Sequence, residues 1–117
     1  MGEQTYVVYL LASGRNGTLY VGSTVDLLGR VAEHRDKVLP GFTKKYGVTR
    51  LMWFEPQESM LAARHRERQI KAWKRQWKID LFKVSNPDWD DLYPSLLDLW
   101  YPAPPHAPPQ RKLGPNS

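Results

Sequence analysis

The stretch TYVVYLLASGRNGTLYVGST, residues 5–24, decides the fold of this chain. Residues 5–12 are β-branched, aromatic and nearly all apolar, a composition typical of a buried strand. The pair Asn16-Gly17 is a strong turn signal, and residues 18–22 favour a second, short strand. The segment therefore predicts an antiparallel hairpin.

Two tyrosines mark this hairpin, Tyr9 in the first strand and Tyr20 in the second, with ten residues between them. Side chains on paired neighbouring strands can share one face of a sheet. A tyrosine hydroxyl can hold a water or act as a base, but its ordinary pKa of about 10 demands a nearby positive charge. Tyrosine is also a good strand residue, so a purely structural role for both stays open.

The rest of the chain alternates helical and extended patterns. The N-cap candidates at 23–26 and an apolar stripe predict a helix to about Val38. Further along, the sequence predicts a loop or short turn at 42–48, a third strand at 50–54 stopped by Pro56, a long helical region from 57 to about 84 with a break near 73–76, and turns or a helix at 88–100. From Tyr101 onward the proline-rich chain predicts a disordered tail.

Composition narrows the class of protein. A length of 117 residues, with 41% hydrophobic and 25% charged residues, is ordinary for one soluble globular domain. There is no cysteine, which excludes disulfides, thiolate zinc sites and a cysteine nucleophile. The start of the chain lacks the pattern of a signal peptide, and no stretch reaches the roughly 18 apolar residues of a membrane span. We expect a cytoplasmic protein.

The charge distribution favours a polyanionic partner, although a charge excess that only keeps the protein soluble would give the same balance. The net charge is +5, and the acidic residues Asp88, Asp90, Asp91 and Asp98 lie together near the end of a basic body. Within that body, a basic stripe interleaved with tryptophans could track a phosphate backbone and offer stacking surfaces. Its lysines and arginines, with a basic pair upstream, are the nucleic-acid-binding candidates Lys44, Lys45, Arg64, Arg68, Lys71, Lys74, Arg75 and Lys78. We expect Trp73 and Trp77 themselves to lie mostly in the core.

Arg30 and His34 stand four residues apart and should share one face of the first helix. A fixed arginine can stabilise the charge that develops on an attacked phosphate, and a histidine can relay protons near neutral pH. An ordinary amphipathic helix edge would give the same spacing, so the pair alone does not decide between the two interpretations.

Glu67 is the only acid between Ser59 and Ile79, and it falls on the apolar side of its helix beside Ala63 and Ile70. A carboxylate in such a place needs a partner, because burying an unpaired charge is costly. The partner could be an arginine of the same basic region. It could also be Mg²⁺ or Mn²⁺, with water and substrate phosphate completing the coordination.

The order of these residues resembles that of the GIY-YIG nuclease superfamily, and in particular its small single-domain bacterial branch. The resemblance runs from about Thr5 to Tyr93. The segments that carry it are YVVYLL at 6–11, NGTLYVGST at 16–24, DLLGRVAEH at 26–34, GFTKKYG at 41–47, RERQIKAWKR at 66–75 and NPDW at 86–89.

The resemblance implies an α+β fold, with a central three-stranded antiparallel sheet flanked by helices over residues 1–100. It also implies a phosphodiesterase site with one metal ion. Its residues would be Tyr9, Tyr20, Arg30, His34 and Asn86, with Glu67 as the metal ligand. In the family a tyrosine is proposed to activate water, and we favour Tyr9. The glycine of the first family motif is Val7 here, a strand position that the single-domain branch varies.

The leading hypothesis is a metal-dependent DNA nuclease with a role in DNA repair or processing. The alternatives are a non-catalytic nucleic-acid-binding module of the same fold, and a small interaction protein that meets an acidic partner. Because the tail is too short to read DNA sequence, we expect low sequence specificity or recognition of structures such as single strands, flaps or ends.

Overall fold

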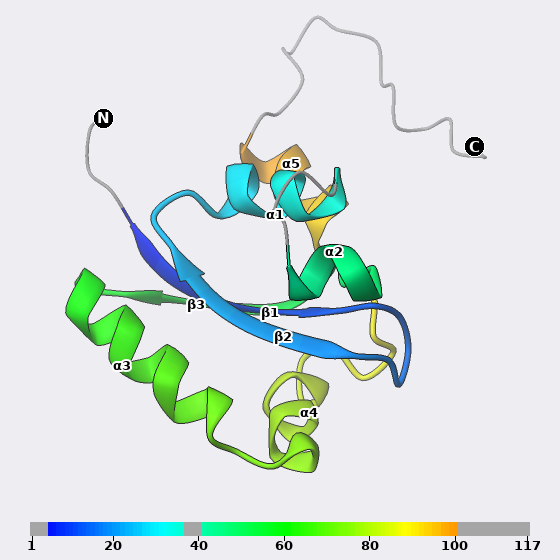
Figure 1. The fold of residues 1–117 in the computed structure, drawn as a ribbon. Helices are drawn as coiled ribbons and strands as arrows, with labels where there is room; N and C mark the ends of the chain where they lie inside the picture. Colours follow the sequence, from blue (N-terminus) through cyan, green and yellow to red (C-terminus); the bar gives the residue numbers. More distant parts are fainter. Residues whose placement is uncertain (1–4, 37–40, 101–117) are drawn as a thin grey trace, which may run out of the picture.

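The computed structural model describes residues 5–36 and 41–100 of the chain, and in these the α+β architecture is confirmed. Three antiparallel strands form one sheet in the order β2-β1-β3, with helices on both faces (Figure 1). The elements are β1 (Tyr6–Ala12), β2 (Leu19–Thr24), α1 (Leu27–Arg35), α2 (Phe42–Tyr46), β3 (Arg50–Gln57), α3 (Met60–Lys71), α4 (Arg75–Lys83) and α5 (Tyr93–Trp100).

The central strand β1 is buried on both faces, which explains its nearly continuous apolar sequence. Val8, Leu10 and Ala12 pack toward α3 and α4, whereas Val7, Tyr9 and Leu11 pack toward α1 and α5. In Figure 1, α1, α2 and α5 lie on one side of the sheet and α3 and α4 on the other. The strand thus separates two small cores, and Tyr9 belongs to the one beneath α1.

The predicted hairpin is confirmed, and its register places Tyr9 opposite Gly22 and Leu11 opposite Tyr20. The predicted break in the long helical region is also confirmed, since α3 ends at Lys71 and α4 begins at Arg75. Side chains cap the N-terminal ends of α1 and α3. Asp26 accepts a hydrogen bond from the N–H of Gly29, and Ser59 accepts one from the N–H of Ala62.

Two local predictions differ from the structure. The loop or turn expected at 42–48 contains the short helix α2, which ends at Gly47 in the left-handed conformation with φ 63°. One turn and a half is too short to show a helical period in the sequence. The strand β3 continues through Pro56 to Gln57 because it lies at the sheet edge, where a proline removes no bond from a second neighbour.

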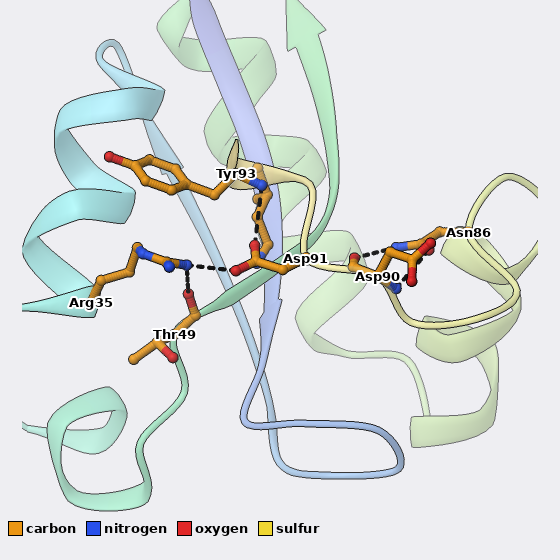
Figure 2. Close-up of polar contacts among 7 residues, drawn as sticks. Arg35, Thr49, Asn86, Asp90, Asp91 and Tyr93 are labelled. Atoms are coloured by element: carbon orange, nitrogen blue, oxygen red, sulfur yellow. Dashed lines mark hydrogen bonds and ion pairs between the residues drawn. The ribbon is translucent and has the colours of Figure 1, made fainter. Parts of the chain in front are cut away.

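An irregularity in β3 is held by the segment that follows α4. The pairing of β1 with β3 shifts between Leu10 and Leu11, which leaves Met52 as an extra residue on β3. The side-chain amide of Asn86 donates to the carbonyl of Met52 at 3.2 Å and to that of Asp90 at 2.9 Å. Asn86 Oδ1 in turn accepts from the N–H of Asp90 (Figure 2). The buried Asn86 therefore closes the bulge by hydrogen bonds.

Asp91 ties three elements together beside this bulge (Figure 2). Its Oδ1 accepts from the backbone N–H groups of Leu51 at 3.0 Å and Tyr93 at 3.1 Å, and its Oδ2 lies 2.6 Å from Arg35 Nη1. The guanidinium of Arg35 also lies 4.7 Å from the centroid of the Tyr93 ring. Asp91 thus connects α1, β3 and the start of α5.

Replacing Asp91 by alanine is expected to destabilise the protein by about 2–4 kcal/mol, because two backbone donors and Arg35 lose their acceptor together. Urea unfolding followed by circular dichroism measures this change. Asp88→Ala is the matched control, since Asp88 is exposed and carries the same charge. Equal stability of the two variants would show that the Asp91 bonds contribute nothing.

Some predictions fall outside the described residues. The end of the first helix at 37–38 and the tail at 101–117 lie there, so the division into a domain at 1–100 and a tail stays a prediction. Within the described part, none of the helices has the length and apolar character needed to cross a membrane.

Candidate functional site

Three aromatic side chains meet on the α1 side of the hairpin, as the sequence predicts for the two tyrosines. The rings of Tyr9 and Tyr20 lie 6.3 Å apart, and the His34 ring lies 5.9 Å from Tyr9 and 5.4 Å from Tyr20 between centroids. β1 and β2 supply the tyrosines and α1 supplies the histidine. The hairpin and the first helix therefore form one aromatic cluster.

A buried hydrogen-bond chain runs through this cluster. Tyr9 Oη lies 3.2 Å from His34 Nε2, and His34 Nδ1 lies 2.9 Å from Thr43 Oγ1 at the start of α2. Burial and the charge of Arg30 lower the pKa of His34, so its ring is neutral at pH 7. With Nδ1–H donating to Thr43, Nε2 is free to accept from the Tyr9 hydroxyl. The chain then leads a proton from Tyr9 toward His34.

The Tyr9 hydroxyl itself stays protonated at neutral pH. Burial and the neighbouring Tyr20 raise the pKa of Tyr9, and the charge of Arg30 offsets only part of this effect. Tyr9 therefore does not act as a preformed phenolate. Any proton that Tyr9 takes from water must be passed on as it arrives, and His34 is the acceptor in contact with it.

Gly22 leaves the space that the Tyr9 ring occupies, because it has no side chain. A Cβ at position 22 would lie 2.5 Å from Tyr9 Oη and 2.7 Å from its Cζ, far inside van der Waals contact. The aromatic ring lies across the neighbouring strand at the one position where no side chain stands. The glycine that follows Tyr20 and Val21 is thus required by the packing of Tyr9.

Arg30 lies on α1 one turn before His34, as the sequence predicts. Its Nε lies 3.3 Å from Glu33 Oε1, three residues further along the helix. This ion pair is exposed and therefore contributes little to stability. The positive charge of Arg30 contributes to the lowered pKa of His34 and offsets part of the rise in the pKa of Tyr9. Arg30 is therefore free to turn toward an anion without breaking a buried contact.

Glu67 is paired, but with a lysine and a serine rather than an arginine. Lys71 Nζ lies 2.6 Å from its Oε2, and Ser23 Oγ donates to its Oε1 at 2.5 Å. Burial raises the pKa of Glu67, but the hydrogen bonds from Lys71 and Ser23 outweigh it and hold the pKa below its ordinary value. The carboxylate is ionised at neutral pH and spans from α3 to the edge strand β2.

Arg30 and Glu67 line two pockets that share Ser23 of β2 and Arg64 of α3. One pocket of about 170 Å³ is lined by Arg30, Ser23 and Arg64 among others. A second pocket of about 350 Å³ shares Ser23 and Arg64 and adds Glu67, Arg68 and Lys71. We call the two pockets together the β2 groove. Its walls carry one carboxylate among several cations, so it is shaped and charged for an anionic chain.

The donor set of the β2 groove fits a hard divalent cation with one protein ligand. No group of three or more His, Cys, Asp or Glu side chains gathers in residues 5–36 and 41–100. Glu67 offers an ionised carboxylate at the wall of an open pocket, and a hard divalent ion held there would take its other oxygen ligands from water and substrate.

The basic candidates divide into two groups. Arg64, Arg68 and Lys71 line the β2 groove beside Glu67. The others lie on exposed or half-buried positions of α2, of the turn after α3 and of α4, namely Lys44, Lys45, Lys74, Arg75 and Lys78. The sequence does not separate these groove cations from the remaining basic surface, and the nucleic-acid-binding role of both groups stays a prediction.

The prediction that the tryptophans are core residues is wrong for Trp77. Trp77 is 51% exposed on α4, whereas Trp73 packs partly against the core below the sheet. The two rings meet edge to face with centroids 6.3 Å apart, and Lys74 Nζ lies 5.2 Å from the centroid of the Trp77 ring. The break at 72–74 turns α4 away from the direction of α3, so helical spacing does not continue from Ile70 to Trp77.

Asn86 stands apart from the other predicted site residues. Its side chain is buried and bonded to the backbone at Met52 and Asp90. Conversely, the structure adds Ser23, Thr43 and the pairing role of Lys71 to the site. Lys71 follows Glu67 at helical spacing, which is a signal for an ion pair. Ser23 and Thr43 reach their partners across the fold, and no local pattern marks them.

Comparisons with known proteins give one structural match and one family match. A solution NMR structure of the UPF0213 protein BH0048 from Bacillus halodurans matches with a TM-score of 0.46 and 24% identity, over 74% of this chain and 92% of that one. No curated protein matches the sequence. The model of the GIY-YIG catalytic domain matches residues 5–80, which span the hairpin, α1, the β2 groove and the start of α4. The chain belongs to the GIY-YIG catalytic domain family.

Proposed function

We propose that this protein is a Mg²⁺-dependent endonuclease that hydrolyses DNA phosphodiester bonds in the β2 groove. The observation that carries the proposal is the β2 groove, whose two pockets share Ser23 and Arg64 and are lined by Arg30 in one and by the ionised Glu67 in the other. A phosphodiester needs cationic stabilisation of its equatorial oxygens and a route for the proton of the attacking water. The groove supplies the cations, and we assign the proton route to the buried Tyr9–His34 pair.

Each residue of the proposed site has a defined task. Arg30 binds the scissile phosphate and stabilises the negative charge that develops on it. The Tyr9 hydroxyl orients the attacking water and passes the proton to His34 Nε2, whose position is fixed by Thr43. Tyr20 packs against both rings and shields the pair from bulk solvent. Asn86 acts indirectly, because it holds the backbone of β3 through Met52.

Glu67 would hold the divalent ion, positioned by Ser23 on the neighbouring strand. When bound, Mg²⁺ would supply neutralising charge to the phosphate and the leaving oxygen. Arg64 and Arg68, which line the same pocket, would bind the phosphates that flank the cleaved one.

The exposed Trp77 favours a substrate with unpaired bases. An indole that stays half exposed among lysines offers a stacking surface for a base, with phosphate contacts beside it. We therefore propose single-stranded or branched DNA, cut with little sequence preference. Such an activity would suit DNA repair or processing in the cytoplasm.

Replacing Trp77 by alanine should weaken binding of single-stranded DNA by about tenfold, because one stacked base is worth about 1–3 kcal/mol. Binding of blunt duplex DNA should change by less than about twofold, since its bases are already stacked. Fluorescence anisotropy with labelled oligonucleotides measures both affinities. Trp77→Phe keeps an aromatic face and should restore most of the loss. Equal losses for both kinds of DNA would contradict a stacking role.

The test of the function is cleavage of labelled single-stranded, duplex and branched DNA in the presence of Mg²⁺, Mn²⁺ or EDTA. The proposal predicts cutting that requires a divalent ion and prefers substrates with unpaired bases. Salt-sensitive binding without any cutting would instead support a nucleic-acid-binding module, in which the Lys71–Glu67 pair has only a structural role.

A further inference from the structure

The carboxylate proposed to hold the metal already has a cation of this chain at its side. Lys71 Nζ lies 2.6 Å from Glu67 Oε2, and Ser23 Oγ donates to Oε1. Both oxygens of Glu67 are therefore engaged. The side chain of Lys71 is 49% exposed and that of Glu67 is 20% exposed, so the lysine stem can swing into solvent while the carboxylate stays in the wall.

We infer that the Lys71 ammonium is the resident counter-ion of the Glu67 site, which a divalent cation must displace in order to bind. The ammonium already lies 2.6 Å from Oε2, so a divalent ion bound to the same carboxylate would stand close beside it. The two cations would also repel each other strongly at such a separation. This inference rests on the proposed function, because it takes Glu67 as the metal ligand.

The displaced ammonium has an anion to meet only when substrate is present. Arg64 and Arg68 line the same pocket, so a freed Lys71 joins two other cations whose neighbouring carboxylate now serves the metal. A phosphate of the substrate backbone is the group that would neutralise this cluster. Lys71 would thus make metal binding weak in the free protein and couple it to the arrival of DNA.

The experiment measures Mn²⁺ binding to the full chain without DNA, from the electron paramagnetic resonance signal of free Mn²⁺. Lys71→Ala should bind Mn²⁺ about tenfold more tightly than the wild type, because the competing charge-assisted hydrogen bond is gone. Lys83→Ala is the matched control. Lys83 is exposed at the end of α4 and carries the same charge, and its removal should change the affinity by less than about twofold.

A cycle with Glu67→Gln separates this inference from the proposed function. The gain from Lys71→Ala should vanish in the Glu67→Gln background, because both effects act on one carboxylate. Unchanged or weaker Mn²⁺ binding by Lys71→Ala would overturn the inference, as would an equal gain in Lys83→Ala. If Glu67→Gln alone left the wild-type affinity unchanged, the metal site itself would be wrong. If alanine disturbs the helix, Lys71→Met provides a second variant. It keeps an apolar stem and should give the same gain in Mn²⁺ affinity.

Discussion

Replacing Glu67 by glutamine is expected to reduce kcat/KM for DNA cleavage by about a thousandfold, because the site loses the charge that holds the divalent ion. Glutamine keeps the shape of the side chain and can still accept from Ser23 Oγ, so the fold should remain intact. DNA binding should stay within about twofold of the wild type, since Arg64 and Arg68 still line the groove.

Single-turnover cleavage and fluorescence anisotropy, measured on the same preparations, separate these two effects. Glu58→Gln is the matched control, because Glu58 is an exposed acid just before α3 and its loss changes the net charge equally. Cleavage by Glu67→Gln at the wild-type rate would show that the carboxylate has no catalytic part. A parallel loss of DNA binding would show that the effect arises from misfolding of the groove.

Replacing Tyr9 by phenylalanine should lower the cleavage rate by about a hundredfold, since general acid–base steps contribute about 10²–10⁴. The variant loses the hydroxyl that donates to His34 Nε2 and leaves a buried acceptor unpaired, at a cost of about 1–3 kcal/mol in stability. His34→Ala should lower the rate similarly. The double variant should be little slower than either single one, because the two residues move the same proton.

The same mechanism predicts how the cleavage rate depends on pH. The pKa of His34 is lowered by burial and by Arg30, so the ring stays neutral and able to accept a proton below its ordinary pKa of about 6.5. The wild-type rate should therefore fall only below about pH 6.5, as His34 becomes protonated. Tyr93→Phe serves as the control for Tyr9→Phe, because Tyr93 lies on α5 and packs beside Arg35 of α1. A rate unaffected by Tyr9→Phe would remove Tyr9 from the mechanism.

Much of the fold is readable from the first half of the chain, where local rules and the tertiary structure agree. The apolar run of β1 predicts a strand, the Asn-Gly pair predicts a turn, and Asp26 predicts the start of a helix. The family resemblance predicts the three-stranded sheet. The short helix α2 and the end of β3 escape prediction for a physical reason. The first has only five residues, too few to show a repeating helical pattern, and the second depends on where the sheet ends, which the local sequence does not show.

The sequence names Tyr9, Tyr20, Arg30, His34 and Glu67 as site residues, but not the residues that support them. The structure brings Tyr9, Tyr20 and His34 together and places Arg30 and Glu67 in two pockets that share Ser23 and Arg64, whereas their catalytic roles stay a prediction. Ser23 and Thr43 are ordinary hydroxyl residues whose partners lie 44 and 9 positions away in the chain. Only the packing of α3 against the hairpin and the contact of α2 with α1 reveal what they bind.

The most direct test of the account is single-turnover cleavage of a labelled forked oligonucleotide by an excess of wild-type protein, in Mg²⁺ and in EDTA, with Arg30→Ala purified in parallel. The account predicts that the wild type cuts in Mg²⁺ and not in EDTA, and that Arg30→Ala binds the fork but cuts it at least about a hundredfold more slowly. A wild-type protein that binds the fork without cutting it, or that cuts no faster than Arg30→Ala, would contradict the account.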